Sequence, residues 1–255
     1  MSSETETLPY SVLADIYDQV MSDVDYETWA DYLDEIILTH HPNALSLLEL
    51  ACGTGNIALT LEELDQYNIK ATDLSESMIR VAKTKGVQIS SAVDFQVMDF
   101  LEPDIHESFD VIYMTFDSLN YLHKEQEILR LHDNAKRLLN RDGIFIYDFT
   151  TPRNSRKAIQ FLNYENRTLE NGIRFSRNST YDAKLRVHSN EFLIEKESTF
   201  NRTEIYREVH LQKIYTLGQI TEMIRKTEFT ILDAYNSFTL EPATDLSLRV
   251  TMVLQ

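Results

Sequence analysis

The spacing of apolar residues over the first 150 positions predicts alternating strands and helices. A short apolar run over 45–50 ends at the glycine turn Gly53-Thr54-Gly55, and a weakly amphipathic segment follows over 57–64. This order is typical of a buried strand that feeds a helix through a tight loop. Further apolar runs predict strands at 69–73, 93–97, 109–115 and 143–149. Helical periodicity predicts helices at 75–85 and 124–139. The sequence therefore predicts an α/β sheet covered by helices.

A helical segment is expected before this region, over residues 10–39. Val12, Ile16 and Val20 fall on one face of it, and apolar residues recur at helical spacing from Tyr26 onward. The ten residues at the start of the chain lack the basic and apolar regions of a secretory signal. We expect them to form a short disordered lead.

The alternation of helices and strands stops after the fifth predicted strand, at 143–149. A turn over 140–143 is expected before that strand. Residues 161–215 are rich in Thr, aromatic and β-branched residues, with turn signals such as Asn171-Gly172. This composition predicts three or four antiparallel strands. A helix over 216–228 and two strands at 231–238 and 246–254 are expected to complete the sheet. The predicted organisation is an N-terminal helical segment over 1–41, a core over 42–158, an inserted β subdomain over 159–215 and a completion of the core over 216–255.

The composition is that of an ordinary globular protein, with 43% hydrophobic and 25% charged residues. A net charge of −17 disfavours a phosphate backbone as partner, and small neutral or cationic molecules fit it better. No apolar run reaches the roughly 18–20 residues that span a bilayer. The single cysteine, Cys52, excludes an internal disulfide and is consistent with a cytoplasmic location.

The glycine turn suits a nucleotide-type ligand, and two such ligands remain open from the residues alone. Gly53, Gly55 and Ala58 fit the dinucleotide fingerprint, in which a pyrophosphate lies on the turn. Glu49 precedes the turn, and two like charges about 4 Å apart repel by roughly 4 kcal/mol near a protein surface. S-adenosylmethionine (SAM) has an ammonium, a sulfonium and no phosphate, so an acid beside it is favourable. Asp73, 20 residues beyond Gly53, could bind the ribose hydroxyls of either ligand.

Two stretches of the sequence resemble class I SAM-dependent methyltransferases. The string E-x-A-C-G-x-G at Glu49–Gly55 resembles motif I, although Ala51 replaces its first glycine, and ATDLSESMIRVAK at 71–83 resembles the following ribose-binding segment. The resemblance covers about residues 10–150. It implies a Rossmann-like sheet of seven strands with the last one antiparallel, SAM as cofactor with S-adenosylhomocysteine as product, and a small-molecule acceptor.

The resemblance also implies positions for the cofactor site and for a lid. Residues 17–37 resemble the N-terminal segment that folds over the SAM pocket in small-molecule methyltransferases, which makes Tyr10 and Tyr26 candidates for lining that pocket. Asp73 would bind ribose, Met78 would lie against adenine and Asp99 would accept a hydrogen bond from the adenine amino group. The cofactor-binding residues expected from it are Tyr17, Trp29, Glu49, Ala51, Gly53, Gly55, Asp73, Leu74, Met78, Met98, Asp99, Phe100 and Thr115.

Methyl transfer from SAM needs chiefly an aligned acceptor, and a general base only if the acceptor is protonated. The loop FDSLNYL at 116–122 resembles that of small-molecule methyltransferases, and the candidates near it are Asp117, Tyr121 and His123, with Asp148 at the end of the next strand. The seven histidines show no metal-ligand spacing, so we expect no metal site. Two other functions remain open, a SAM-binding partner or sensor without catalysis and a tRNA methyltransferase. The β subdomain could close over the acceptor or form a homodimer.

Overall fold

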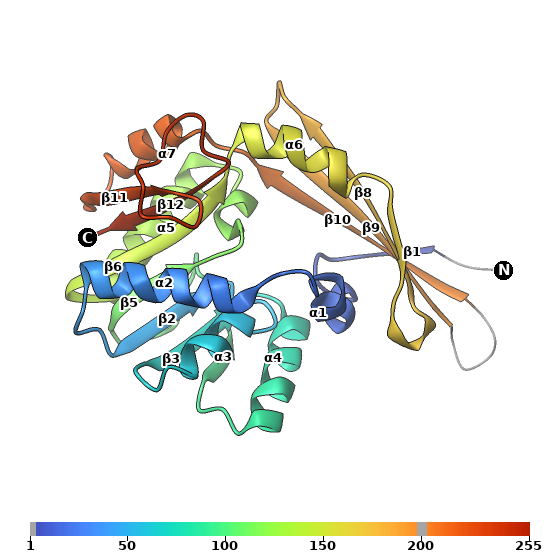
Figure 1. The fold of residues 1–255 in the computed structure, drawn as a ribbon, viewed down its shortest axis with the longest axis horizontal. Coiled ribbons are helices and arrows are strands. Elements are labelled where there is room, and N and C mark those ends of the chain that lie inside the picture. Colours follow the sequence, from blue (N-terminus) through green and yellow to red (C-terminus); the bar gives the residue numbers. More distant parts are fainter. Residues whose placement is uncertain (1–3, 198–202) are drawn as a thin grey trace.

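A seven-stranded sheet forms the larger part of the structure, a computed structural model that describes residues 4–197 and 203–255 (Figure 1). Its strand order is β11-β12-β6-β5-β2-β3-β4. The first strands are parallel, whereas β12 runs antiparallel to both β6 and β11. The strands are β2 (Ser46–Leu50), β3 (Asn68–Asp73), β4 (Asp94–Val97), β5 (Phe109–Met114), β6 (Leu139–Thr150), β11 (Ile231–Asn236) and β12 (Arg249–Leu254). The predicted Rossmann-like sheet with an antiparallel last strand is confirmed.

Successive residues of the central strands belong to two separate hydrophobic cores because side chains alternate across a sheet. Leu47 and Val111 pack under one layer of helices, and Leu48 and Ile112 pack under the other. Helices α2, α3 and α4 cover the first face, and α5 and α7 cover the second. Their bounds are α2 (Tyr26–His40), α3 (Asn56–Glu62), α4 (Glu76–Ile89), α5 (Glu125–Leu138) and α7 (Leu217–Ile224).

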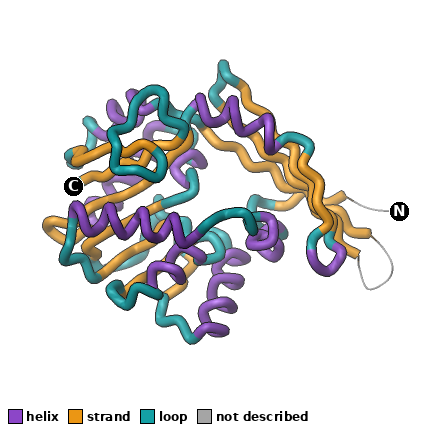
Figure 2. The backbone as a smooth tube through the Cα atoms, viewed as in Figure 1, coloured by secondary structure: helices purple, strands orange, loops and turns teal. Residues whose placement is uncertain are grey.

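A second sheet of five strands extends from one end of the molecule (Figures 1 and 2). Its order is β1-β10-β9-β8-β7, and its strands are β1 (Glu4–Thr7), β7 (Glu165–Thr168), β8 (Arg174–Asp182), β9 (Val187–Glu197) and β10 (Thr203–Lys213). Helix α6 (Pro152–Leu162) leads from β6 into it, and the 3-10 turn η3 (Glu170–Gly172) separates β7 from β8. Four of these strands lie where the sequence predicted antiparallel pairing.

The N-terminal segment departs from the prediction in two ways. Residues 4–7 of the expected disordered lead form β1, which pairs in parallel with β10 and so completes that edge of the second sheet. The expected continuous helix is broken into η1 (Leu13–Ile16), α1 (Tyr17–Val20) and α2. The break occurs because η1 and α1 turn their apolar residues onto the second sheet, whereas α2 packs on the first.

The expected turn over 140–143 lies within β6 instead. Strand pairing begins at Leu139, opposite Phe109, and shifts its register before Ile144 meets Val111. A Cβ atom on Gly143 would lie 2.9 Å from the backbone oxygen of Asp110. The glycine therefore allows two strands to approach each other closely. The sequence indicated a turn instead because the residues just before Gly143 are typical of turns.

Among the described residues, no helix is long and apolar enough to cross a membrane.

The short 3-10 helix η2 (Ser118–Tyr121), which follows β5, completes the elements that surround the site described below.

Gly55 allows a test of how the glycine turn is packed. It has φ +80°, and a Cβ atom there would lie 2.5 Å from Cε1 of the buried Phe95. We expect Gly55→Ala to lower the free energy of unfolding by about 2–4 kcal/mol, because it combines backbone strain with overpacking. Chemical denaturation measures this change. Gly218→Ala, in α7 and with nothing within 4 Å, is the control and should be neutral or stabilising by up to ~1 kcal/mol. Equal stability of the two variants would contradict the packing argument.

Candidate active site

A cavity of about 710 Å³ opens at the carboxyl ends of β2, β3, β4 and β5. Parallel strands present their carboxyl ends on the same edge of a sheet, where open α/β sheets bind ligands. Residues predicted from the sequence supply much of its wall: Tyr17, Glu49, Ala51, Gly53, Asp73, Leu74, Met78, Asp99, Phe100, Thr115 and Tyr121. We call this space the nucleoside cavity.

Asp73 fixes the shape of the glycine turn. Its Oδ2 accepts a hydrogen bond of 2.9 Å from the Gly53 backbone amide, and its Oδ1 accepts one of 2.8 Å from that of Ser75. Burial raises the pKa of the Asp73 carboxyl, and the two amides oppose that shift by stabilising the charged form. Each oxygen keeps a second lone pair for a ligand. The carboxylate therefore joins the ends of β2 and β3 and still faces the cavity.

Glu49 is a buried acid without a full set of partners. It is 1% exposed, and its Oε2 has no hydrogen-bond partner among the described residues. Burial raises the pKa of Glu49 to about 8, and the nearby Asp73 carboxylate adds to the shift. Such an acid is suited to a cation, because a positive ligand would stabilise its charged form.

Six predicted site residues do not line the nucleoside cavity, and Asp117 and Asp148, two of them, are described below. Gly55 faces Phe95 and provides the left-handed residue before α3, and Met98 packs in the hydrophobic core. Trp29 lies in a second cavity. His123 lies on the surface, where its Nε2 is 3.0 Å from the backbone oxygen of Leu211, and it lines neither cavity. The structure therefore gives no support to its predicted catalytic role.

The second cavity, of about 510 Å³, lies between the large sheet, the N-terminal segment and the second sheet. We call it the acceptor chamber. Tyr10, Tyr17, Phe116 and Tyr121 line both cavities and so form a shared aromatic wall. Tyr26, the remaining aromatic candidate of the lid, lines the nucleoside cavity.

Asp117 enters the acceptor chamber from a strained turn. Phe116 and Asp117 both have left-handed backbones, with φ of 59° and 63°. Two consecutive non-glycine residues in this region are costly, and such strain persists where neighbouring contacts enforce it, often at functional sites. Here the Asp117 amide is 3.4 Å from Oδ1 of Asp148, and both side chains are held by Arg249.

Arg249 is a site residue that the sequence did not indicate. Its Nη2 donates to Oδ2 of Asp117 at 3.1 Å, its Nη1 pairs with Oδ2 of Asp148, and its guanidinium lies 5.1 Å from the ring centre of Trp29. One cation and two carboxylates leave this group with one net negative charge. Arg249 begins β12, more than 100 positions beyond its partners, so only the strand pairing of the folded sheet brings it there.

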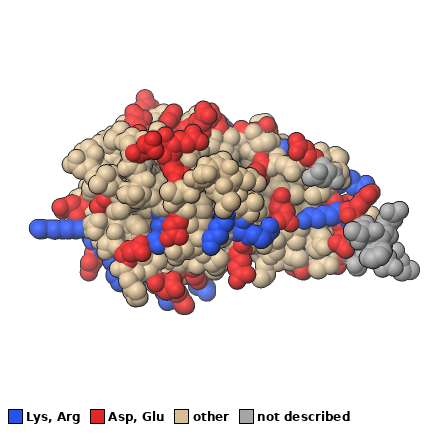
Figure 3. All heavy atoms as spheres, turned by 90° about the horizontal axis from the view of Figure 1, so that it is seen from below, with Lys and Arg blue, Asp and Glu red and all other residues tan. Residues whose placement is uncertain are grey.

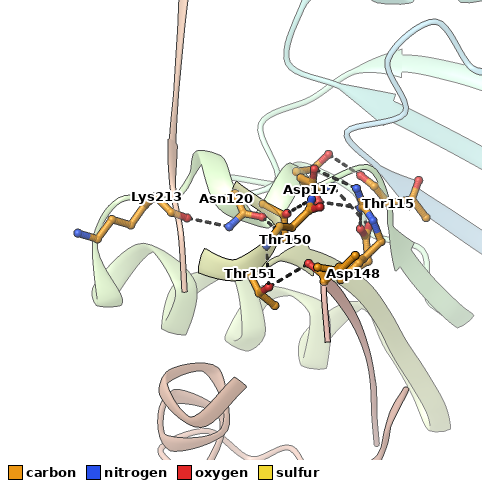
Figure 4. A network of polar contacts seen from close by, with 11 residues as sticks. Thr115, Asp117, Asn120, Asp148, Thr150, Thr151 and Lys213 are labelled. Atoms are coloured by element: carbon orange, nitrogen blue, oxygen red, sulfur yellow. Dashed lines mark hydrogen bonds and ion pairs between the residues drawn. The ribbon is translucent and has the colours of Figure 1, made fainter. Parts of the chain in front are cut away.

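Asn120 connects the large sheet to the second one (Figure 4). Its side chain is fully buried, its oxygen accepts a hydrogen bond of 3.0 Å from the Thr150 amide, and its Nδ2 donates to the Lys213 backbone oxygen at 2.7 Å. These contacts hold the loop after β5 against the end of β10. They fix the distance between the two sheets at the acceptor chamber.

The N-terminal segment is attached to the second sheet by the buried carboxylate of Glu208. This side chain accepts hydrogen bonds from the backbone amides of Tyr10, Val12 and Leu13, at 2.7, 2.6 and 3.0 Å. The pKa of Glu208 is lowered: burial opposes the charged form, but the hydrogen bonds from His210 and from these three amides outweigh it. Glu208 therefore stays ionised and holds the segment over the chamber.

A line of hydrogen bonds leads from Glu208 to the aromatic wall. The Nε2 of His210 is 3.3 Å from the Glu208 carboxylate, and its Nδ1 is 2.9 Å from the hydroxyl of Tyr121. That hydroxyl is 2.6 Å from the hydroxyl of Tyr10. An Nε2–H that faces the carboxylate leaves Nδ1 as an acceptor for Tyr121. Both tyrosines are thereby held in place on the wall.

Glu208→Gln tests this attachment. An amide would replace one acceptor oxygen with an N–H donor that faces other donors, and hydrogen bonds to a charged group contribute about 1.5–3 kcal/mol each. We expect the backbone amides of Tyr10, Val12 and Leu13 to exchange at least tenfold faster, as measured by hydrogen–deuterium exchange. The control is Glu204→Gln, at an exposed position of the same strand. Unchanged exchange in Glu208→Gln would contradict the anchoring role.

Comparisons with known proteins agree with the geometry. Residues 47–143 match a family described as a methyltransferase domain. A putative methyltransferase of Geobacillus sp. strain WCH70 is 26% identical over 253 residues, which cover 96% of this chain and 99% of that protein.

Two solved structures share the fold over nearly the whole chain. One is a SAM-dependent methyltransferase from Clostridium acetobutylicum, with a TM-score of 0.77, 23% identity and coverage of 96% of this chain and 98% of that one. The other is SAM-bound CalS10 from Micromonospora echinaspora, described as an amino pentose methyltransferase, with a TM-score of 0.68, 16% identity and 98% coverage of both chains. The matched domain, the relative that spans the whole chain and the shared fold all make the chain similar to Rossmann-like methyltransferases of class I.

Proposed function

We propose that this protein transfers the methyl group of SAM to the nitrogen of a small-molecule amine. The observation that carries this proposal is the shared aromatic wall between a nucleoside cavity and a chamber with an acidic group at that wall. A cofactor on one side and an acceptor on the other would meet there. Holding two reactants together in this way is the main source of rate in a simple displacement.

The residues of the nucleoside cavity fit SAM. Asp73 offers free lone pairs to ribose hydroxyls, and Asp99 faces the cavity near Met78. The unpaired Oε2 of Glu49 suits a positive group, which would stabilise the ionised form of this acid, whereas a dinucleotide phosphate would have no such favourable interaction with it. When bound, SAM supplies a methyl carbon that its positive sulfur activates toward displacement. The solved relative CalS10 binds SAM, which supports the same choice of cofactor here.

The acidic group at the wall favours nitrogen as the acceptor atom. An amine becomes positively charged as it takes up a methyl group, and the net negative charge of Asp117, Asp148 and Arg249 would stabilise that charge. Burial raises the pKa of both Tyr10 and Tyr121, so their hydroxyls stay protonated and position an acceptor rather than deprotonate it. The description of CalS10 as an amino pentose methyltransferase points to the same class of acceptor.

A small acceptor also agrees with the size and charge of the molecule. The acceptor chamber, at about 510 Å³, is in the range of small-molecule sites. The chain carries a net charge of −17, and Figure 3 shows acidic and basic side chains interspersed on one face of its described part. A nucleic-acid backbone would be repelled by this charge. The second sheet closes the chamber in this proposal, which leaves no need for a second copy of the chain.

A transfer assay tests the proposal. With SAM carrying a labelled methyl group, we expect label in small primary amines and none in the matching alcohols. Asp117→Asn should lower the rate at least tenfold, because it removes the net negative charge beside the wall. The control is Asp104→Asn, at an exposed loop position. Transfer to alcohols at equal rates, transfer to tRNA alone, or SAM binding without transfer to any acceptor would each contradict the proposal.

The raised pKa of Glu49 predicts that SAM binding depends on pH. With a pKa of about 8, Glu49 is mostly protonated at pH 7, and a cation beside it favours the ionised form. Binding should therefore release a proton, and the dissociation constant should fall as pH rises from 6 to 7.5. Calorimetry in buffers of different ionisation enthalpy measures the released protons. Glu49→Gln should bind more weakly and release none. Proton uptake by the unsubstituted protein would contradict this account.

A further inference from the structure

One face of the second sheet forms the wall of the acceptor chamber opposite the large sheet. The strand register places Arg177 opposite Phe192 and Asn190 opposite His210, on alternate positions of β8, β9 and β10. Residues at alternate positions share a face of a sheet. The apolar end of this face is covered by Leu13 and Ile16, and its polar end is open to the chamber.

A positive group lies at this wall. Arg167 on β7 and Arg177 on β8 both pair with the single carboxylate of Glu165. Asp23, which is 4.0 Å from Arg167, is 94% exposed and contributes little. The group therefore has one net positive charge, in a protein whose total charge is −17. The Arg177 side chain is only 15% exposed, so water screens it weakly.

Apart from Oδ1 of Asp117, which is 2.7 Å from Nη1 of Arg249, three buried polar atoms around the chamber have no hydrogen-bond partner within residues 4–197 and 203–255. They are Nε of Arg177, Nε2 of His188 and Oγ of Ser155. His188 and Ser155 are 4% and 1% exposed, and all three residues line the chamber. Ser155 belongs to α6, which packs on β8. Buried polar groups are rarely left unpaired, so a set of them around one cavity indicates that a polar ligand completes it.

The chamber therefore has two ends of opposite charge. Asp117, Asp148 and Arg249 form the negative end at the aromatic wall, and Arg167, Arg177 and Glu165 form the positive end. His188 lines the same chamber. Burial lowers the pKa of His188 and the Arg177 charge lowers it further, whereas a hydrogen bond with Asn190 and the Asp117 charge oppose the shift.

We infer that the acceptor is an amine that also carries a carboxylate or phosphate group, bound by Arg177, His188 and Ser155. This inference rests on the proposed function, because it places the amine at Asp117 and the anionic group at the other end. An Arg N–H and a neutral histidine are suited to an anionic oxygen, and Arg binds carboxylate and phosphate in similar ways. An amine without an acidic group would leave the three polar atoms unpaired.

Trp29 provides a direct measure of binding in the chamber. It is the single tryptophan of the chain and lines the chamber beside Arg249. The probes are two matched pairs, O-phosphoethanolamine with ethanolamine and γ-aminobutyrate with n-butylamine. We expect the acidic member of at least one pair to change Trp29 fluorescence at a concentration at least tenfold lower than its partner. Preference in only one pair would identify the anionic group as phosphate or as carboxylate.

Three variants assign the effect to the positive end. Arg177→Gln should remove the preference for the acidic probe. Arg174→Gln, an exposed position on the same strand, is the matched control and should retain it. Glu165→Gln removes a counter-charge and should increase the preference at least threefold, so it tests the inference even where Arg177→Gln does not fold.

Equal response to both members of each pair, or no response to any probe, would overturn the inference. A preference that Arg177→Gln retains or Glu165→Gln decreases would also overturn it. The transfer assay with labelled SAM tests the proposed function separately. A preference for the acidic probes without transfer to any amine would refute that function and leave the anion site standing, whereas transfer without preference would do the reverse.

Discussion

The carboxylate of Glu208 is the contact on which the shape of the acceptor chamber depends. A buried charge is stable only when it is well paired, and this one is paired with three backbone amides of the N-terminal segment and with His210. It therefore joins a strand of the second sheet to residues that precede the large sheet in sequence. Asn120 makes the corresponding connection from the other side. These two side chains therefore hold the walls of the acceptor chamber in place beside the nucleoside cavity.

Local patterns in the sequence were sufficient to predict the large sheet and most of the nucleoside cavity. The turn at Gly53 and the acids Glu49 and Asp73 lie at the ends of short segments whose apolar residues decide the structure, whereas Asp99 and Thr115 were expected from the resemblance to methyltransferases. In a parallel sheet, such segments bring their carboxyl ends together without further information. The antiparallel strands of the second sheet were predicted from local patterns too, namely the residue composition and turn signals of 161–215.

The acceptor chamber could not be predicted in this way because long-range pairing builds it. Arg249 reaches Asp117 and Asp148 only through the register of β12 on β6, and Glu208 meets Tyr10 across nearly 200 positions. The residues 4–7 looked like a disordered lead because their polar sequence has no apolar face. They form a strand since β10 offers a free edge whose backbone groups they pair with.

The pairing of β1 with β10 limits how the chamber can open. Because β1 is fixed to one sheet and α2 is packed on the other, residues 8–25 are attached at both ends. Asp18, in the middle of this span, also accepts a hydrogen bond from the hydroxyl of Thr54 in the glycine turn. A displacement of this segment would therefore be that of a bridge between two fixed points. Because Tyr10 and Tyr17 of this bridge line both cavities, a displacement of the bridge would change the walls of both.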